Sequence, residues 1–112
     1  WEISKGFDQS APLSKFFSIK ELSNRDAINF HLDVNGKTVQ QGSSADMVFS
    51  FEEIISYVSG FMKIKTGDMI FTGTPSGVGP IKIGDRLEGY IEDKKLLDFL
   101  IKKMNKYLRI QL

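Results

Sequence analysis

The strongest constraint on the fold is an alternating segment that runs directly into an Asn-Gly pair. Apolar residues occupy every second position of residues 27–34, namely Ile28, Phe30, Leu32 and Val34. This is the period of a half-buried β-strand. Asn35-Gly36 follows at once, and both residues tolerate the positive φ angles of a tight turn. The chain is therefore predicted to return as an antiparallel strand over residues 37–41.

A second patterned segment predicts a helix over residues 51–62. Its apolar residues recur at spacings of three and four and would form one stripe: Ile54, Ile55, Val58, Phe61 and Met62. Ser50 and Glu53 have the spacing of a capping box, in which each side chain bonds the backbone N–H of the other residue. We expect one amphipathic helix with a well-defined start.

Further strands are predicted after two Gly-Asp turns. Residues 69–72 form a short apolar run, which indicates a buried strand. Residues 86–92 alternate imperfectly, as a strand with one irregularity would, and the sheet is expected to continue over residues 96–101. Residues 102–112 are basic and weakly periodic, and both a short helix and a frayed end are open for them.

Residues 72–80 form a loop that composition does not explain. Three glycines and two prolines in nine residues exclude the interior of a helix or strand. Such glycines let backbone N–H groups approach an anion closely, and threonine hydroxyls add uncharged donors. The segment matches neither a Walker loop nor a dinucleotide fingerprint. It is either an anion or enolate site or only a demanding turn, and the residues alone favour the turn.

Other chemistry-bearing residues are weak candidates when taken singly. Lys5 lies among small and aromatic residues that could desolvate it, but lysines are usually solvated. Asp8 and Asp46 stand alone. The single histidine, His31, falls on the polar side of the first predicted strand and cannot build a histidine-rich metal site. Ser76 lies outside any nucleophile elbow, which disfavours a serine hydrolase.

Composition excludes several classes of partner. Fifteen Lys and Arg against fourteen Asp and Glu give a net charge of +1, so no long-range field would attract nucleic acid or an anionic membrane. The lack of cysteine removes disulfides and thiolate metal sites, and it fits a reducing compartment. No stretch approaches the roughly 20 apolar residues of a membrane helix. We expect a cytoplasmic protein without nucleic-acid or membrane partners.

Taken together, these segments resemble the fumarylacetoacetate hydrolase family. Residues 1–13 are similar to its Trp-then-Lys segment, which continues through Phe and Ala-Pro. Residues 35–49 are similar to its Asn-Gly, Gln, Thr, Met-hydrophobic-Phe block, with Ser44 where threonine is usual. The most specific match is Thr-Gly-Thr-Pro followed by Gly-Val-Gly over residues 72–79, with a Gly-Asp pair on each side. Several spaced blocks in one order rarely arise by chance.

The resemblance implies a fold and a domain organisation. Family members are β-rich α+β proteins with a rolled mixed β-sheet and few helices, and they generally assemble as dimers. Residues 1–101 would be the carboxyl-terminal part of a single catalytic domain, whose amino-terminal part would precede Trp1. Residues 102–112 would be an unassigned basic tail. The predicted strands, hairpin and helix agree with this class, and a homodimer is expected.

The resemblance also implies metal-dependent chemistry on a small 2-oxo acid. Members hold a divalent cation, usually magnesium, with calcium or manganese as alternatives, through a Glu-x-Glu pair and a separate Asp. These ligands would lie upstream of Trp1, so no metal ligand is expected in this chain. The metal would chelate the substrate and stabilise an enolate. Acylpyruvate hydrolysis, oxaloacetate decarboxylation and dienoate isomerisation could all pass through that enolate, and the choice stays open.

Site roles implied by the resemblance fall on five residues. Lys5 matches the catalytic lysine that faces the substrate near the metal, where its charge would stabilise the enolate or carboxylate. Thr74 matches the loop threonine that hydrogen-bonds the substrate carboxylate, and Gly73 belongs to the same loop. Gln40 is a weaker substrate-binding candidate, as is Ser44, because both could merely tie the hairpin to the loop. Lys5 and Thr74 are expected to converge on one pocket.

Two other classes stay open beside the enzyme. A non-catalytic binding module could retain the loop and work without a metal. An inactive truncated fragment could depend on a partner for its fold, and this chain alone is expected to be inactive even where the full-length protein is an enzyme.

Overall fold

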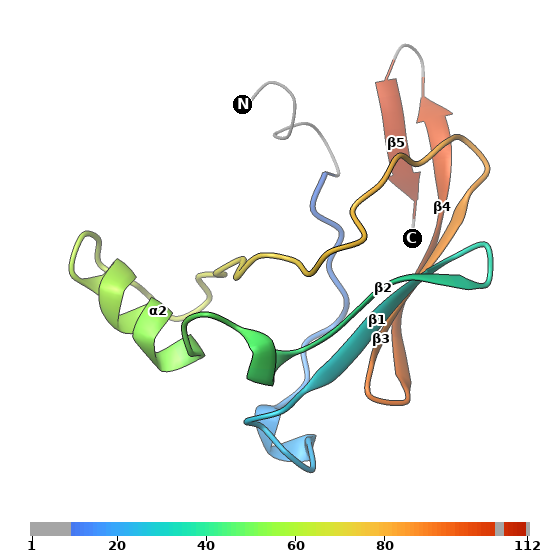
Figure 1. The fold of residues 1–112 in the computed structure, drawn as a ribbon. Coiled ribbons are helices and arrows are strands. Elements are labelled where there is room, and N and C mark those ends of the chain that lie inside the picture. The colour runs from blue at the N-terminus through green and yellow to red at the C-terminus, as the bar shows by residue number, and fades with distance from the viewer. Residues whose placement is uncertain (1–9, 105–106, 112) are drawn as a thin grey trace.

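The computed structural model describes residues 10–104 and 107–111, with side chains described through residue 102. Five strands form one sheet in the order β2-β1-β3-β4-β5, and the helix α2 stands apart from it (Figure 1). The elements are β1 Asn29–Val34, β2 Lys37–Ser43, α2 Phe51–Ser59, β3 Arg86–Ile91, β4 Lys94–Met104 and β5 Tyr107–Gln111. Short 3-10 helices occupy η1 Ile19–Glu21 and η2 Ser44–Asp46.

The sheet is open, and all of its described strand pairs are antiparallel. Hairpins join β1 to β2, β3 to β4 and β4 to β5, while a long connection through α2 brings β3 beside β1. The expectation of a β-rich fold with few helices is confirmed. Within the described residues, however, no parallel pair provides the mixture of strand directions that was expected.

The β1–β2 hairpin forms where the sequence predicted it. Asn35 has a φ of 53° and Gly36 a φ of 80°, so both turn residues take the left-handed conformation that the alternating segment required. Strand β2 continues to Ser43, beyond the predicted end at residue 41. The predicted irregularity in β3 is also present, as a register shift between Gly89 and Tyr90.

A small hydrophobic core lies on one face of the sheet. Its buried hydrophobic residues are Leu87, Phe99 and Ile101, and the partly buried residues packed against them are Leu32, Val34 and Leu97. Side chains alternate between the two faces along each strand, so the neighbours of Leu87 point the other way. The core therefore joins β1, β3 and β4, and the opposite face of these strands carries mostly polar residues.

The polar face of the sheet carries a network of charges. Arg86 donates to both carboxylate oxygens of Asp98, from Nε at 2.9 Å and from Nη2 at 2.7 Å. Lys95 Nζ lies 3.1 Å from carboxylate oxygens of both Glu88 and Asp98. The hydrogen bond from Arg86, followed by that from Lys95, lowers the pKa of Asp98. Because these groups are solvent-accessible, the network contributes little to stability pair by pair.

Helix α2 begins as predicted and ends earlier. The capping box is confirmed: Glu53 N donates to Ser50 Oγ at 3.2 Å, and Ser50 N donates to the Glu53 carboxylate at 2.7 Å. The bond from the Ser50 backbone is the main cause that lowers the pKa of Glu53. The helix ends at Ser59 with Gly60 as its C-cap, so the last two residues of the predicted stripe lie outside it.

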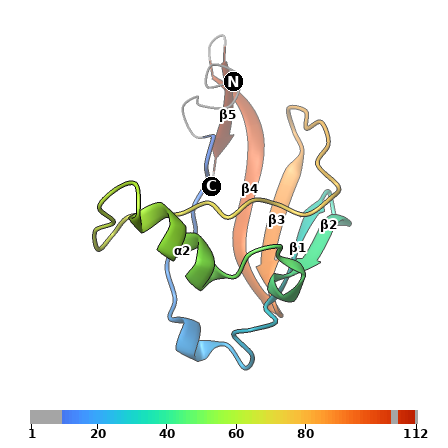
Figure 2. The ribbon, with the colours of Figure 1, turned by 60° about the vertical axis from the view of Figure 1, so that its left-hand side comes forward.

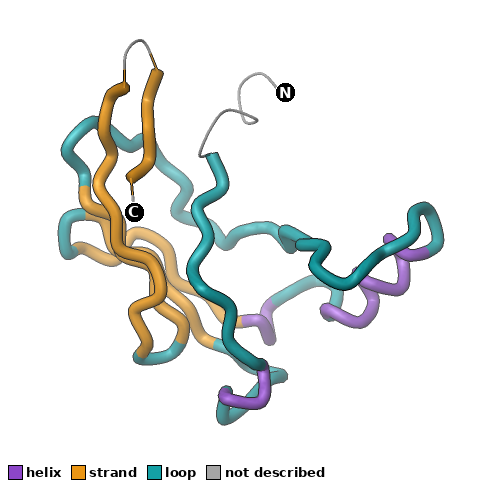
Figure 3. The backbone as a smooth tube through the Cα atoms, turned by 180° about the vertical axis from the view of Figure 1, so that it is seen from behind, coloured by secondary structure: helices purple, strands orange, loops and turns teal. Residues whose placement is uncertain are grey.

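The helix does not pack on the sheet. None of its residues is buried, and in Figures 1 and 3 it lies well away from the strands, whereas the view of Figure 2 brings it forward of the sheet. Ile55 is 49% exposed, and beyond the helix Phe61 is 75% exposed. Of the predicted apolar stripe, Ile55, Phe61 and Met62 are therefore exposed, while Ile54 and Val58 are half-buried. No helix in this part of the chain has the length and apolarity needed to cross a membrane.

Two further expectations are wrong. Residues 69–72 are not a buried strand but an extended loop, in which Phe71 is 68% exposed. A strand requires a neighbour for its backbone hydrogen bonds, and no described strand lies beside this segment. The stretch 102–112 contains the end of β4 and the paired strand β5, rather than a short helix or a frayed end.

Candidate functional site

The glycine-rich loop 72–80 is joined to strand β2 by the side chain of Gln40. Gln40 Nε2 donates to Thr74 Oγ1 at 3.0 Å and to the Pro75 carbonyl oxygen at 2.9 Å. Because the Pro75 carbonyl can only accept, the amide nitrogen of Gln40 and not its oxygen must face the loop. The sequence-based possibility that Gln40 ties the hairpin to the loop is thus what the structure contains.

Two glycines allow the loop and the hairpin to approach closely. Gly77 has a φ of 105°, and a Cβ atom there would overlap the carbonyl oxygen of Val39. On β2, a Cβ atom at Gly42 would lie 3.3 Å from Pro75 and 3.0 Å from the Phe30 ring. A side chain at either position would push the loop away from the strand, most severely at Gly77.

Gly73 and Thr74 present donors that no other described residue uses. Gly73 has a φ of 98°, a left-handed conformation of the kind that occurs in backbone loops that bind anions. Neither the Gly73 N–H nor the Thr74 N–H donates to another residue in the described part of the chain. Thr74 Oγ1 accepts from Gln40, so its own proton is available for a further acceptor. This group of uncharged donors suits a carboxylate.

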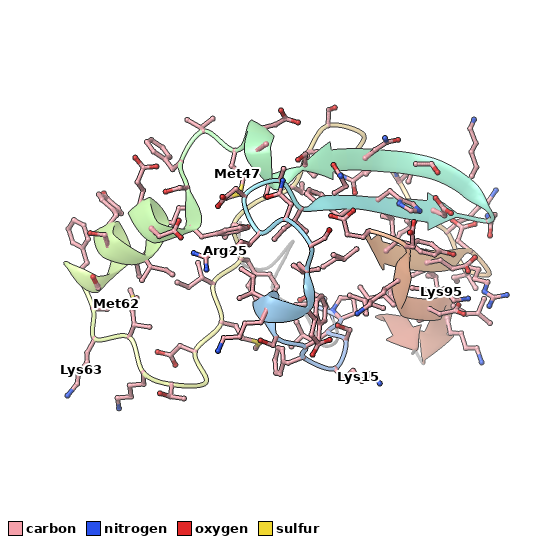
Figure 4. All side chains as sticks on the ribbon, turned by 90° about the horizontal axis from the view of Figure 1, so that it is seen from below. Lys15, Arg25, Met47, Met62, Lys63 and Lys95 are labelled. Atoms are coloured by element: carbon pink, nitrogen blue, oxygen red, sulfur yellow. The ribbon has the colours of Figure 1, made fainter. Side chains whose placement is uncertain are left out.

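Gly73 and Thr74 line an open groove of about 740 Å³. Loop residues 72–76 contribute its polar donors, and Ser43, Ser44 and Asp46 add further polar groups. The apolar lining includes Met47, Phe49, Phe51 and Ile54. Figure 4 places Met47 on the segment between η2 and α2. Clefts that combine apolar lining with a few polar groups are typical small-molecule sites.

The structure brings some of the candidate residues named from the sequence together and leaves others apart. Gly73 and Thr74 line the groove together, and Gln40 contacts Thr74 directly. Ser44 does not contact the loop through a hydrogen bond; its hydroxyl accepts from Ile28 N at 2.8 Å and fixes the end of β2 to the start of β1. Lys5 lies outside the described residues, so its convergence with Thr74 stays a prediction.

Sequence reasoning did not single out the apolar part of the groove. The signal was present, since Met47 and Phe49 belong to the Met-hydrophobic-Phe block. His31 is the sheet residue that its position predicted: its ring stacks on Tyr90 with centroids 4.4 Å apart. Its Nε2 lies 3.9 Å from Asp33 Oδ1.

The described residues do not form a metal centre. No group of three or more His, Cys, Asp or Glu side chains in residues 10–102 could hold a metal ion. Asp68 accepts from Lys65 N at 2.8 Å, and Asp85 accepts from Lys82 N at 2.9 Å, so these carboxylates serve separate turns. By themselves, the described residues therefore do not fit the divalent cation that the resemblance implies.

The hairpin, the glycine-rich loop and the strands that follow occur in an order that a known family shares. A family model described as the carboxyl-terminal domain of fumarylacetoacetate (FAA) hydrolase matches residues 1–104. The chain belongs to the fumarylacetoacetate hydrolase family. Membership accounts for the loop, the hairpin and β4 together, because all three fall within the matched residues.

Curated relatives in the fumarylacetoacetate hydrolase family include two oxaloacetate tautomerases. The mitochondrial protein of Mus musculus is 40% identical over 103 residues, which are 92% of this chain and 47% of that protein. The Escherichia coli protein is 44% identical over 88 residues, which are 78% of this chain and 40% of that protein. This chain therefore spans about half the length of the curated relatives it matches.

Solved structures share the fold of the fumarylacetoacetate hydrolase family with this chain. The fumarylpyruvate hydrolase of Pseudomonas aeruginosa, in complex with Mn²⁺ and pyruvate, has a TM-score of 0.79 and 35% identity over 86% of this chain and 42% of that one. The maleylpyruvate hydrolase of Sphingobium has a TM-score of 0.67 and 30% identity over 71% of this chain and 30% of that one. The fold of this chain is that of the matched part of these enzymes.

Proposed function

We propose that residues 1–101 form the carboxyl-terminal part of a catalytic domain that acts on a small 2-oxo acid. The main supporting observation is that Gly73 and Thr74 line an open groove and that their N–H groups donate to no other described residue, in a member of this family. A carboxylate is the group on a 2-oxo acid that such donors would bind. The names of the relatives, oxaloacetate tautomerase and fumarylpyruvate hydrolase, support this substrate class.

The substrate would be placed by its carboxylate. The Thr74 hydroxyl and the backbone N–H groups of Gly73 and Thr74 would donate to the carboxylate oxygens, while the apolar residues of the groove would contact the carbon chain. Lys5 would supply positive charge where an enolate develops. Oxaloacetate and acylpyruvates are the first substrates to test, because relatives are named for them. Dienoates stay open, because a 5-carboxymethyl-2-hydroxymuconate delta-isomerase of Mycobacterium smegmatis has a similar fold.

The proposal extends to a cofactor, an assembly and a location. A divalent cation, magnesium in the first instance, would be held by residues other than those described here, since these contain no suitable cluster; the Pseudomonas aeruginosa structure contains Mn²⁺. The full-length protein would be a homodimer in the cytoplasm, although the Mus musculus relative is mitochondrial, so cell fractionation is needed to test the location.

A pair of threonine variants tests the function. In the full-length protein, Thr74→Val should raise KM for oxaloacetate or fumarylpyruvate by about 10- to 100-fold, because a hydrogen bond to a charged group is lost. Thr74→Ser keeps the hydroxyl and should stay within a few-fold of the wild type. Absence of turnover of both compounds by the wild-type protein would refute the enzyme assignment.

A non-catalytic binding module is the second candidate. It would use the Thr74 hydroxyl, which accepts from Gln40, to bind a carboxylate without a metal. Plasma emission analysis of the metal content of the full-length protein separates the two: a stoichiometric divalent cation with turnover supports the enzyme. Binding of pyruvate without metal and without turnover supports the module.

A further inference from the structure

We propose that Gln40 is a positioning residue, which turns the Thr74 hydroxyl proton toward the groove and does not itself contact the substrate. The inference rests on the proposed function, because it specifies how the loop presents its donors to a carboxylate. It assigns to Gln40 a role that differs from the direct substrate contact expected from the family pattern.

The hydrogen-bond inventory of Gln40 supports this role. A glutamine amide nitrogen carries two hydrogens. One is donated to Thr74 Oγ1 at 3.0 Å and the other to the Pro75 carbonyl at 2.9 Å. The nitrogen of the half-buried Gln40 therefore has no hydrogen left for a ligand in the groove.

The same bond determines what Thr74 can do. A threonine hydroxyl has one proton and can also accept. Since Gln40 donates to the oxygen, the Thr74 proton must point elsewhere, and no described residue accepts it. A hydroxyl that accepts one hydrogen bond becomes a stronger donor of the next. Thr74 is thus held as a donor. Gly73, whose N–H donates to no other described residue, lines the groove beside it.

The second bond of Gln40 immobilises the loop. Pro75 has a restricted φ, and its carbonyl is held by Gln40 while its ring lies beside Gly42. Gln40 therefore controls both the place of the loop and the direction of the hydroxyl. Two substitutions separate these effects, because one reverses the polarity of the side chain and the other removes its hydrogen bonds.

The test uses three single variants of the full-length protein, Gln40→Glu, Gln40→Met and Thr74→Val. It also uses two double variants, in which Thr74→Val is combined with each substitution of Gln40. A glutamate at this position can only accept at neutral pH, so it would take the Thr74 proton away from the groove and repel the Pro75 carbonyl. Methionine has a similar length and makes neither bond. Thr38→Val is the matched control. Thr38 lies on β2, as Gln40 does, and its hydroxyl donates to Asp33 of β1 at 2.7 Å, so its loss removes a hydrogen bond but leaves the loop untouched.

Two readouts are required: KM and kcat for oxaloacetate, and the dissociation constant of pyruvate from titration followed by NMR. We expect Gln40→Glu to weaken pyruvate binding and to raise KM by about 10-fold or more, because the hydrogen bond from Thr74 to the substrate carboxylate is lost. Thr74→Val should have an effect of the same size. The value of kcat should change much less. Adding Thr74→Val to Gln40→Glu should cause no further loss, and Thr38→Val should leave both constants unchanged.

Several results would overturn the inference. Wild-type affinity for pyruvate in Gln40→Glu would do so, as would losses that multiply in the double variant. Lower thermal stability of Gln40→Met with unchanged pyruvate affinity would reduce Gln40 to a structural tie. Failure of the proposed function differs from these: a wild type that binds pyruvate in a Gln40-dependent way without turnover refutes the enzyme and supports the positioning role. A wild type that neither binds pyruvate nor turns over either substrate refutes both.

Discussion

Gly77 lies so close to Val39 that a Cβ atom at position 77 would overlap the Val39 carbonyl oxygen. Its φ of 105° is also one that residues with a side chain rarely adopt. The loop thus depends on glycine here for two independent reasons. Because the same loop carries Gly73 and Thr74 into the groove, the contact between Gly77 and β2 connects the packing of the hairpin to the candidate site.

Gly77→Ala should displace the loop from β2. We expect a loss of stability on the order of 1–3 kcal/mol from backbone strain, together with weakened pyruvate binding. Thermal unfolding and the pyruvate titration measure the two effects. Gly79→Ala is the control, because a Cβ atom at Gly79 would meet no other atom within 4 Å. Equal behaviour of the two variants would contradict the close packing of the loop.

Protonation of Asp85 should lower the folding stability of the protein in acid. The residue is 5% exposed, and hydrogen bonds from Lys82 N and then from the Asn35 side chain lower its pKa below the usual 3.8. Its contribution is therefore complete above the unfolded-state pKa and is lost as the pH falls through the lower folded-state pKa.

Denaturant midpoints measured from neutral pH down to acid test this expectation. The midpoint of the wild type should drop at and below about pH 4. Asp85→Asn should lower the midpoint at neutral pH and flatten the drop, because an amide must face one of the two donors with its own N–H groups. Asp93→Asn, at an exposed turn position, should retain the wild-type profile. A similar flattening in both variants would refute the assignment to Asp85.

Ser50→Ala should loosen the start of α2. Loss of the bond from Glu53 N removes the N-cap and costs about 1 kcal/mol of helix stability. Hydrogen exchange of the α2 amides should accelerate while exchange in the sheet stays unchanged, because α2 does not pack on the strands. Ser56→Ala, in the exposed middle of the same helix, is the control. Uniform acceleration throughout the protein would argue against an independently stabilised helix.

Lys5→Met in the full-length protein should lower kcat by about 100- to 1,000-fold, the usual cost of removing one charge-stabilising donor. Metal content should change little, since the lysine is assigned to the substrate. Lys15→Met, at an exposed position (Figure 4), is the control. An unchanged turnover number would return Lys5 to the class of ordinary solvated lysines.

Features fixed by short-range interactions were predictable from the sequence. The Asn35-Gly36 turn and the Ser50–Glu53 capping box each depend on residues at most three positions apart, and both formed as predicted. The extended loop 69–72 and the strand β5 were mispredicted. Their states depend on whether another strand lies beside them, and an apolar or basic run carries no information about that neighbour.

The candidate site divides in the same way. The sequence by itself determined the glycine-rich loop and the chemistry of Thr74 as an uncharged donor, because those properties belong to the residues and their backbone preferences. Only the tertiary structure decided that Gln40 donates to Thr74 and that Met47 and Phe49 share a groove with the loop. These relationships join residues far apart in the chain, and they depend on where the hairpin and the loop meet in space.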